Sequence, residues 1–566
     1  MTSDAYTLPP QPDAVRRAGG TLDRVSARLW NILTPLLITG GAGFLRFWRL
    51  GTPHSIVPLD ETYYAPNSLG YLCYGTDMGF SAQGSHTCSG LEPVFAVHPP
   101  VGKILISAGI KIFGYRPFGW RFVPALAGTL IVLLAYLIAR RLWPDKRWPA
   151  AAAAILVACD GLLFVQSRLA MLDIFLAFFI VLGVWLMLED RDRARASKGF
   201  RWWRLGAGIA FGLAIASKWA AIPMLPVVAA VALAWEAGRI RDERERAAQD
   251  DRPDAVGVGE GSSTDPNQNP GSVDDPSPTP FWDDDGSSQR AVRPGRRNSL
   301  WFQIPATLAT FLFIPVVVYV ASYTPWMLSS KRYVPPRCND VTTVNGVSRS
   351  EPKAGISYWL CYQREILDYH RHLTAFDAKG NPIHPYMSRP WSWPWISRPA
   401  SHYNARYCAP SHTPEPCKNG EVVTDDEILG LPNPIIWWAG FYYALPACIF
   451  WLIFRRDDVA ALLVVLFAPL VIPWFVYSRP LFLFYMTPAA VFLSLMVVHA
   501  MVRWRWRWLA VAYVALAVAA FGFFYPVLAA YPLPLHGVFG WENRMWFGHL
   551  LRGDCLSAKI KLFCWI

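Results

Sequence analysis

Long apolar runs limit what this chain can fold into more than any other feature of the sequence. Several runs reach about 18 residues, the length that an α-helix needs to cross the hydrocarbon core of a bilayer. Hydrophobic residues make up 53% of the 566 residues and charged residues only 17%. We therefore predict an all-α polytopic membrane protein. About eleven spans are expected, at residues 30–47, 122–139, 150–165, 169–188, 205–217, 219–235, 302–323, 434–454, 459–475, 481–501 and 509–525.

The basic residues predict how these spans are oriented. The formal net charge is +12, but the Lys and Arg clusters fall between spans, where the positive-inside rule explains them without a nucleic-acid partner. The N-terminus is then cytoplasmic and the C-terminus extracytoplasmic. Residues 1–29 are polar and Arg-rich and lack the apolar core of a cleavable signal.

The spans divide the chain into segments on alternating sides of the membrane. Residues 98–113 are apolar but short and interrupted by two lysines, which indicates a helix lying in the membrane interface. A short outer turn is expected at 166–168. The expected segments are a cytoplasmic tail (1–29), an N-terminal transmembrane module (30–237) that includes a catalytic outer loop (48–97) and the interfacial helix (98–113), a disordered cytoplasmic linker (238–300), one span (301–323), a large outer loop (324–432), a C-terminal four-helix region (433–525) and an outer tail (526–566).

Eight of the ten cysteines fall in the predicted outer segments. Thiols in an oxidising compartment form disulfides. A zinc site is disfavoured, because no closely spaced cysteine pair is accompanied by histidines at zinc spacing. Pairing between sequence neighbours is the simplest arrangement, although eight cysteines allow 105 connectivities. The candidate pairs are Cys73 with Cys88, Cys338 with Cys361, Cys408 with Cys417, and Cys555 with Cys564.

Two adjacent carboxylates, Asp60 and Glu61, follow the first expected span. An isolated acid pair at a membrane boundary is more often the solvated start of a loop. Here the outer segments also supply cations and many aromatic side chains. A carboxylate can deprotonate a hydroxyl, and cations can stabilise a phosphate leaving group. These parts together fit group transfer from a lipid-linked phosphate donor, although Arg121, Lys218 and Arg479 taken singly could each anchor the end of a span.

Asp173 lies inside the expected span 169–188. A charged group at that depth is costly unless it is paired. We therefore expect it to pair with a basic side chain and hold the helices together, and favour this role over a catalytic one.

Several motifs follow one another in an order that resembles the protein O-mannosyltransferases. The order and spacing match from about residue 30 to residue 545, and the ordered set is specific where an acid pair alone is not. The motifs are the acid pair Asp60 and Glu61, His-Pro-Pro-Val-Gly-Lys at 98–103, Arg-Leu-Ala-Met-Leu-Asp at 168–173, Ser-Lys-Trp at 217–219, Arg-Pro-Trp-Ser-Trp-Pro at 389–394, Asn-Pro-Ile-Ile-Trp-Trp at 433–438, and the segment 479–488.

The resemblance implies the GT-C fold of membrane glycosyltransferases. It also implies transfer of mannose from a polyprenyl monophosphate carrier to Ser or Thr of secreted proteins, with inversion at the anomeric carbon. By position, Asp60 matches the general base and Glu61 its neighbour near donor and acceptor. The donor and its phosphate are then expected to contact Arg121, His98, Lys103, Lys218, Arg479 and Tyr485.

Two departures from the family pattern are visible. The outer loop 324–432 is too short for the β-trefoil module of eukaryotic members, which indicates the bacterial, actinobacterial-like branch. The site would then face the extracytoplasmic side of a bacterial plasma membrane, with the secretion translocon as a candidate partner. Met486 stands where the last motif usually has histidine, so a histidine role is not transferred to that position.

Other readings of the sequence stay open. The acid pair has no third carboxylate or paired histidines nearby, so a site without metal is favoured over a divalent-metal site. A related enzyme could use a polyprenyl phosphate sugar but act on a lipid or cell-wall glycan. A transporter is disfavoured because the ionisable residues cluster at one face and no inverted repeat is visible. A purely structural scaffold fits the acid and cations least well.

Overall fold

The computed structural model describes residues 13–81, 86–194, 200–250, 300–344, 347–352, 355–380, 382–408, 413–414, 422–504, 506–547 and 565. The chain falls into two compact units, Met1–Ala229 with Thr310–Ile566, and Ala230–Ala309. The second unit contains most of α9 (Met224–Asp250) and all of α10 (Leu300–Leu308). All the candidate active-site residues belong to the first unit, which is described below.

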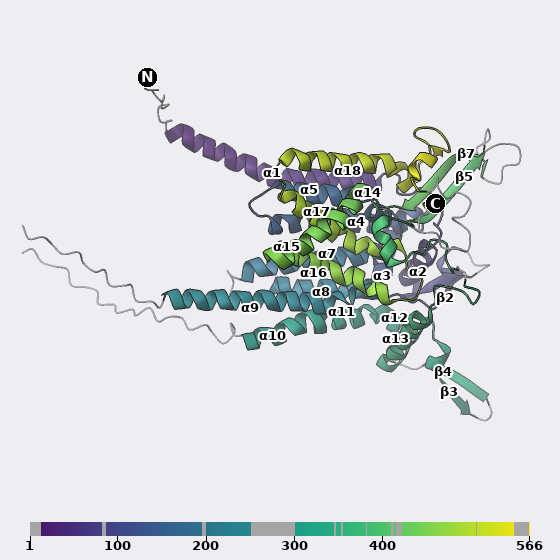
Figure 1. The fold of residues 1–566 in the computed structure, drawn as a ribbon. Helices are drawn as coiled ribbons and strands as arrows, with labels where there is room; N and C mark the ends of the chain where they lie inside the picture. Colours follow the sequence, from purple (N-terminus) through teal and green to yellow (C-terminus); the bar gives the residue numbers. More distant parts are fainter. Residues whose placement is uncertain are drawn as a thin grey trace, which may run out of the picture. The chain divides into compact units, whose positions relative to one another are not determined.

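The N-terminal part of the first unit is a bundle of helices in which α4 occupies a central position (Figure 1). Pro117, at the first turn of α4, favours a helix start there because its fixed φ suits that position. Helices α1, α3, α5 and α7 all pack against α4, and α7 also packs along α8. The helices are α1 (Asp13–Phe47), α2 (Glu61–Tyr74), α3 (Val101–Phe113), α4 (Pro117–Leu142), α5 (Trp148–Ala158), α6 (Gly161–Arg168), α7 (Asp173–Ala194), α8 (Trp202–Ser217) and the short η2 (Trp219–Ala221).

The C-terminal part of the unit adds a second set of helices, and α17 lies deepest among them. Residues 483–501 are all buried, in keeping with a helix that is apolar on all sides. It packs against α5, α7, α15 and α16. The elements are η4 (Ala309–Phe313), α11 (Ile314–Ser322), α12 (Thr324–Leu328), α14 (Pro434–Ala439), η7 (Gly440–Ala444), α15 (Leu445–Arg455), α16 (Asp458–Val471), η8 (Ile472–Val476), η9 (Leu483–Met486), α17 (Thr487–Val502) and α18 (Arg507–Leu528).

In the described part of the chain, seven helices are long and apolar enough to cross a membrane, or eight if one bent pair counts as a span. Helices α1, α7 and α8 coincide with expected spans but are not among the seven. A membrane protein of several helical spans is therefore confirmed, whereas the count of eleven and the orientation of the termini are not.

The expected turn at 166–168 is wrong, because those residues form the end of α6. The connection to α7 comes later, at 169–172, and an additional break separates α5 from α6, which are bent by 58°. Asp160 explains its position: the side chain accepts hydrogen bonds from the Leu163 amide at 2.9 Å and from Trp437 Nε1 at 2.8 Å. An aspartate that caps a helix in this way favours a new helix start.

The segments predicted to be outer contain strands and additional helices, which corrects the all-α prediction. The hairpins β1–β2 and β3–β4 are antiparallel, and a four-stranded antiparallel sheet has the order β6-β5-β7-β8. The strands are β1 (Met78–Phe80), β2 (Leu91–Pro93), β3 (Asn339–Val344), β4 (Val347–Pro352), β5 (Ala400–Cys408), β6 (Thr413–Pro414), β7 (Val422–Gly430) and β8 (Leu533–Pro534). The helical pieces are η1 (Cys88–Gly90), η5 (Pro336–Cys338), α13 (Gly355–His372), η6 (Pro390–Trp395) and η10 (Glu542–Arg544).

The predicted cytoplasmic linker begins later than expected. Helix α9 continues through Asp250, so residues 238–250 are helical. Ion pairs between Arg239 and two glutamates, Glu236 at 3.0 Å and Glu243 at 2.5 Å, favour this extension at i,i+3 and i,i+4 spacing. Most of the remaining linker, 251–299, lies outside the described residues.

Two of the four candidate disulfides are present. They join Cys73 to Cys88 and Cys338 to Cys361. Cys408 is also disulfide-bonded. The other three candidates, Cys417, Cys555 and Cys564, lie outside the described residues.

Candidate active site

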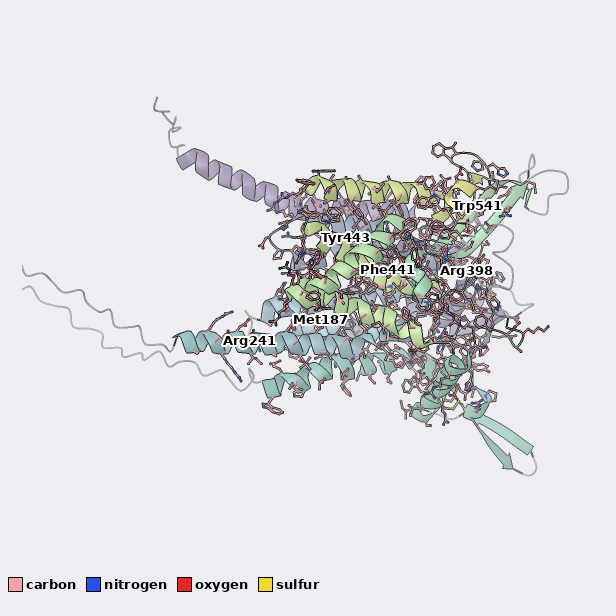
Figure 2. All side chains as sticks on the ribbon, in the orientation of Figure 1. Met187, Arg241, Arg398, Phe441, Tyr443 and Trp541 are labelled. Atoms are coloured by element: carbon pink, nitrogen blue, oxygen red, sulfur yellow. A yellow bond between two sulfur atoms is a disulfide. The ribbon has the colours of Figure 1, made fainter. Side chains whose placement is uncertain are left out.

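The segments predicted to lie outside the membrane gather at one end of the helical bundle. Figure 2 places Arg398 and Trp541 at this end, beside β5 and β7, and Met187 of α7 toward the other end. The loops that carry the acid pair and the motif 98–103 lie at the same end as α2, α3 and β2 (Figure 1). The candidate residues divide here into side chains that are fully paired and side chains that are not.

Glu61, the first residue of α2, is buried and fully hydrogen-bonded. Its Oε1 accepts from Arg121 Nε at 2.9 Å and from the Ala170 amide at 3.1 Å. Its Oε2 accepts from Arg121 Nη2 at 2.7 Å and from the Val57 amide at 2.8 Å. This carboxylate therefore joins the loop before α2 to α4 and to the segment after α6.

Arg121 of α4 uses all five of its N–H donors inside the protein. Besides the two bonds to Glu61, Nη1 donates to the carbonyls of Leu50 at 3.3 Å and Pro53 at 3.0 Å, and Nη2 donates to the Ser55 carbonyl at 3.1 Å. The side chain is fully buried. No donor of this guanidinium is left for a ligand.

Asp60 contrasts with its neighbour. It precedes α2 and is partly exposed, and its side chain does not cap the helix. Within the described residues its side chain makes no hydrogen bond or ion pair, although it lies in the electrostatic field of Lys218, Asp173 and Arg479. Burial raises the pKa of Asp60 to about 6, and the charge of Lys218 partly opposes that rise. The carboxylate is therefore mostly ionised at neutral pH and has both oxygens available.

Lys218, between α8 and η2, is paired with Asp173 at the start of α7. Its Nζ lies 2.8 Å from each carboxylate oxygen. The pairing expected for Asp173 is thus confirmed. The same ammonium lies 4.7 Å from the centre of the Tyr485 ring, within cation–π range.

Lys103 of α3 is also engaged. Its ammonium forms a buried ion pair with Asp77 and donates to the His98 carbonyl at 2.7 Å. Asp77 in turn accepts from the Tyr71 hydroxyl at 3.0 Å. These bonds join the start of α3 to α2 and the β1 hairpin.

Arg479, between η8 and η9, has a different set of partners. Nη1 lies 2.9 Å from His370 Nδ1 in α13, and Nη2 lies 3.4 Å from the Tyr485 hydroxyl. Nε is buried without a partner. Among the described residues no carboxylate forms an ion pair with Arg479, so its positive charge is not neutralised by direct contact.

Comparison with known proteins places this arrangement in a family. A family model described as dolichyl-phosphate-mannose-protein mannosyltransferase matches residues 36–246. The polyprenol-phosphate-mannose–protein mannosyltransferase of Mycobacterium tuberculosis is 31% identical, with 84% of this chain and 80% of that protein covered. The protein of the same name from Corynebacterium glutamicum is 27% identical, with 88% and 85% covered.

The chain belongs to the protein mannosyltransferase family. Membership confirms the predicted reaction class, that of a glycosyltransferase. The structure of the S. cerevisiae protein O-mannosyltransferase Pmt1-Pmt2 complex has a TM-score of 0.62 to this chain and covers 94% of each chain, at 14% identity. That likeness supports the predicted GT-C fold.

In this mannosyltransferase the predicted site residues separate into two groups. The first group consists of side chains that touch one another or shift one another's pKa, namely Asp60, His98, Lys218, Arg479 and Tyr485. Burial, reinforced by Lys218 and other nearby cations, holds the pKa of His98 well below its usual value. Glu61, Arg121 and Lys103 instead complete buried contacts around the first group.

His370 is the residue of this site that sequence reasoning missed. The centre of its ring lies 5.9 Å from the centre of the His98 ring and 5.8 Å from that of the Trp219 ring. A signal was present, because Tyr362, Ile366 and His370 recur every four residues and so share one face of a helix. From the sequence we expect an irregular, aromatic-rich loop here and no helix, so this periodicity is not recognised.

The residues that the structure describes contain no group of three or more His, Cys, Asp or Glu side chains placed to hold a metal ion. Asp60 has Lys218 and Arg479 as charged neighbours. The expectation that the site works without a divalent metal stays a prediction.

Proposed function

We propose that this protein transfers mannose from a polyprenyl monophosphate carrier to Ser or Thr hydroxyls of proteins, with inversion and with Asp60 as the general base. The observation that carries the proposal is the contrast within the acid pair. Glu61 accepts four hydrogen bonds, whereas Asp60 has unused oxygens beside Lys218 and Arg479. The names of the mycobacterial and corynebacterial relatives support the donor and the acceptor class.

Each step of the reaction can be assigned to a group in this cluster. An Asp60 oxygen accepts the proton of the acceptor hydroxyl. The hydroxyl oxygen forms a bond to the anomeric carbon, and the bond from that carbon to the phosphate oxygen breaks on the opposite face of the sugar. The electron pair leaves with the polyprenyl phosphate, and Asp60 later loses its proton to water.

The leaving phosphate requires a cation with free donors. Arg479 keeps one unused N–H on each Nη atom, besides the buried Nε, and has no neutralising carboxylate among the described residues. Lys218 contributes a positive charge that Asp173 already partly neutralises. We therefore assign phosphate binding to Arg479, with Tyr485 and His98 beside it, and assign Arg121, Lys103 and Glu61 to positioning rather than to donor contact.

The cations also bear on metal dependence. Two positive side chains close to the base can stabilise the phosphate charge without a divalent ion. We propose a metal-free reaction, and expect chelation with EDTA to leave the transfer rate unchanged. Recovery of activity by added Mg²⁺ or Mn²⁺ after chelation would overturn this part.

The topology belongs to the same proposal. Disulfides in α2 and α13 imply that the site end of the bundle faces an oxidising compartment. We place that end outside the bacterial plasma membrane, with the N-terminus cytoplasmic, the C-terminus extracytoplasmic and about eleven membrane-crossing or partly crossing segments. Acceptors would then meet the site as they leave the secretion translocon. Labelling of engineered single cysteines with an impermeant maleimide tests the orientation.

The decisive experiment follows radiolabelled mannose from polyprenyl phosphate mannose to a Ser/Thr-rich peptide. Purified wild type, Asp60→Asn and the control Asp145→Asn, at an exposed carboxylate after α4, are compared at equal concentration. Labelled peptide with wild type and the control, but not with Asp60→Asn, supports the proposal. Label on a lipid or glycan instead of the peptide favours another polyprenyl-phosphate-sugar transferase.

A further inference from the structure

His370 and Arg479 come from different outer segments and meet through one short contact. Arg479 Nη1 lies 2.9 Å from His370 Nδ1. A guanidinium has donors and no acceptor, so it must donate here. His370 Nδ1 therefore carries a lone pair and no proton.

The other ring nitrogen then carries the proton. His370 Nε2 lies 3.3 Å from the carbonyl oxygen of Val97, which can only accept. The two contacts select one neutral tautomer, with hydrogen on Nε2. Burial and then the charge of Arg479 lower the pKa of His370 to about 4, so the ring keeps this form near neutral pH.

Helix α13 is held firmly enough to fix that ring. The Tyr362 hydroxyl bonds to the Ala96 carbonyl at 3.2 Å, and Tyr319 donates to Gln363 at 2.5 Å. The disulfide between Cys338 and Cys361 ties the same helix to η5. The imidazole is thus anchored through its helix and through Val97.

We propose that His370 is a positioning residue for Arg479, and that its neutral imidazole orients the guanidinium toward the phosphate of the lipid donor. The inference rests on the proposed function for the identity of that donor. A carboxylate in this place would orient the arginine equally well but would neutralise it and repel phosphate. A neutral acceptor orients the side chain and leaves its full charge for the anion.

The test compares His370→Ala, His370→Asn and His370→Gln with wild type. The Asn side-chain oxygen falls near the position of Nδ1, whereas the Gln amide reaches toward that of Nε2. We expect His370→Ala to raise the donor KM and the Kd for undecaprenyl phosphate by about tenfold or more, with a smaller effect on peptide KM. His370→Asn should restore most of the affinity and His370→Gln less.

A control and a double variant separate positioning from a purely structural role. His372 lies on the same helix, is exposed and, among the described residues, has a hydrogen bond to the Asp368 carbonyl within its own helix, so His372→Ala should behave as wild type. If His370 acts through Arg479, then His370→Ala/Arg479→Ala binds undecaprenyl phosphate no more weakly than Arg479→Ala. Additive losses, or a lowered Tm without a change in Kd, would overturn the proposal.

The two proposals fail in different ways. Absence of mannose transfer to peptide by wild type contradicts the proposed function, whereas the binding comparison with undecaprenyl phosphate needs no transfer. Equal Kd values for wild type and His370→Ala contradict the positioning role even if peptide mannosylation is observed.

Discussion

Glu61 and Arg121 are joined by two hydrogen bonds, Nε to Oε1 at 2.9 Å and Nη2 to Oε2 at 2.7 Å, and neither side chain has bonding capacity left over. Each is also bound by backbone groups of loops that flank the site. The second acid of the pair is therefore fully engaged in buried contacts, whereas the side chain of Asp60 has no bonded partner among the described residues. This division of roles can be tested separately for each residue.

Replacement of Arg121 should damage folding more than phosphate binding. Arg121→Ala leaves the buried Glu61 carboxylate without its partner, and breaking a buried pair in this way typically costs about 3–5 kcal/mol. We expect a clear fall in the Tm of the purified protein, while Arg116→Ala, at an exposed position just before α4, leaves it unchanged. A normal Tm combined with weak binding of undecaprenyl phosphate would instead make Arg121 a donor ligand.

Replacement of Asp60 should have the opposite signature. Asp60→Asn removes the base but breaks no hydrogen bond or ion pair with a described residue. The transfer rate should fall by about 10²–10⁴-fold, as is usual when a positioned base is lost, and the Tm should not fall. Single-turnover transfer and thermal unfolding on one preparation check both parts, and near-normal turnover would remove Asp60 from the mechanism.

Sequence alone predicted what depends on local composition. The apolar segments became helices, and Cys73 and Cys338 found the partners expected from proximity in sequence, because helix formation in a membrane and short-range pairing need little information from distant residues. The acid pair and the candidate cations could also be selected, since their motifs are short, and their roles stay predictions.

The side-chain partners could not be predicted in the same way. Arg121 and Glu61 are 60 residues apart. Nothing in the sequence around Arg121 indicates that it donates its hydrogen bonds to the carbonyl groups of a loop. The break at Asp160 depends on Trp437, 277 residues away. The contact of His370 with Arg479 requires a helix in a loop that looked irregular. Such pairings follow from tertiary packing, which composition and spacing do not encode.

The pH dependence of transfer should show the titration of Asp60. Burial raises the pKa of this carboxyl to about 6 from an ordinary value of 3.8. Since the base must be ionised, kcat/KM should rise tenfold per pH unit below about 6 and level off above it. The free energy of unfolding changes with pH in the opposite direction. Between about pH 4 and pH 6 Asp60 holds a proton in the folded state that it has lost in the unfolded state, so its contribution to stability falls as the pH rises.

The neighbours of Asp60 should move that pH profile in opposite directions. Asp173 raises the pKa of Asp60 and Arg479 lowers it. Asp173→Asn removes a negative charge, so the acidic limb of the profile should shift to lower pH. Arg479→Gln removes a positive charge, so the limb should shift to higher pH, in addition to weaker donor binding.

Measuring kcat/KM for the lipid donor from about pH 4.5 to pH 8, at saturating peptide, checks both shifts. Asp145→Asn serves as the control, because this exposed carboxylate is not among the charges that shift the Asp60 pKa. Shifts of the same sign in Asp173→Asn and Arg479→Gln would mean that the limb reports a change in structure and not the charge on the base. Opposite shifts would identify the titrating group as one that feels the charges of both Asp173 and Arg479, and Asp60 is the carboxylate whose pKa both of them shift.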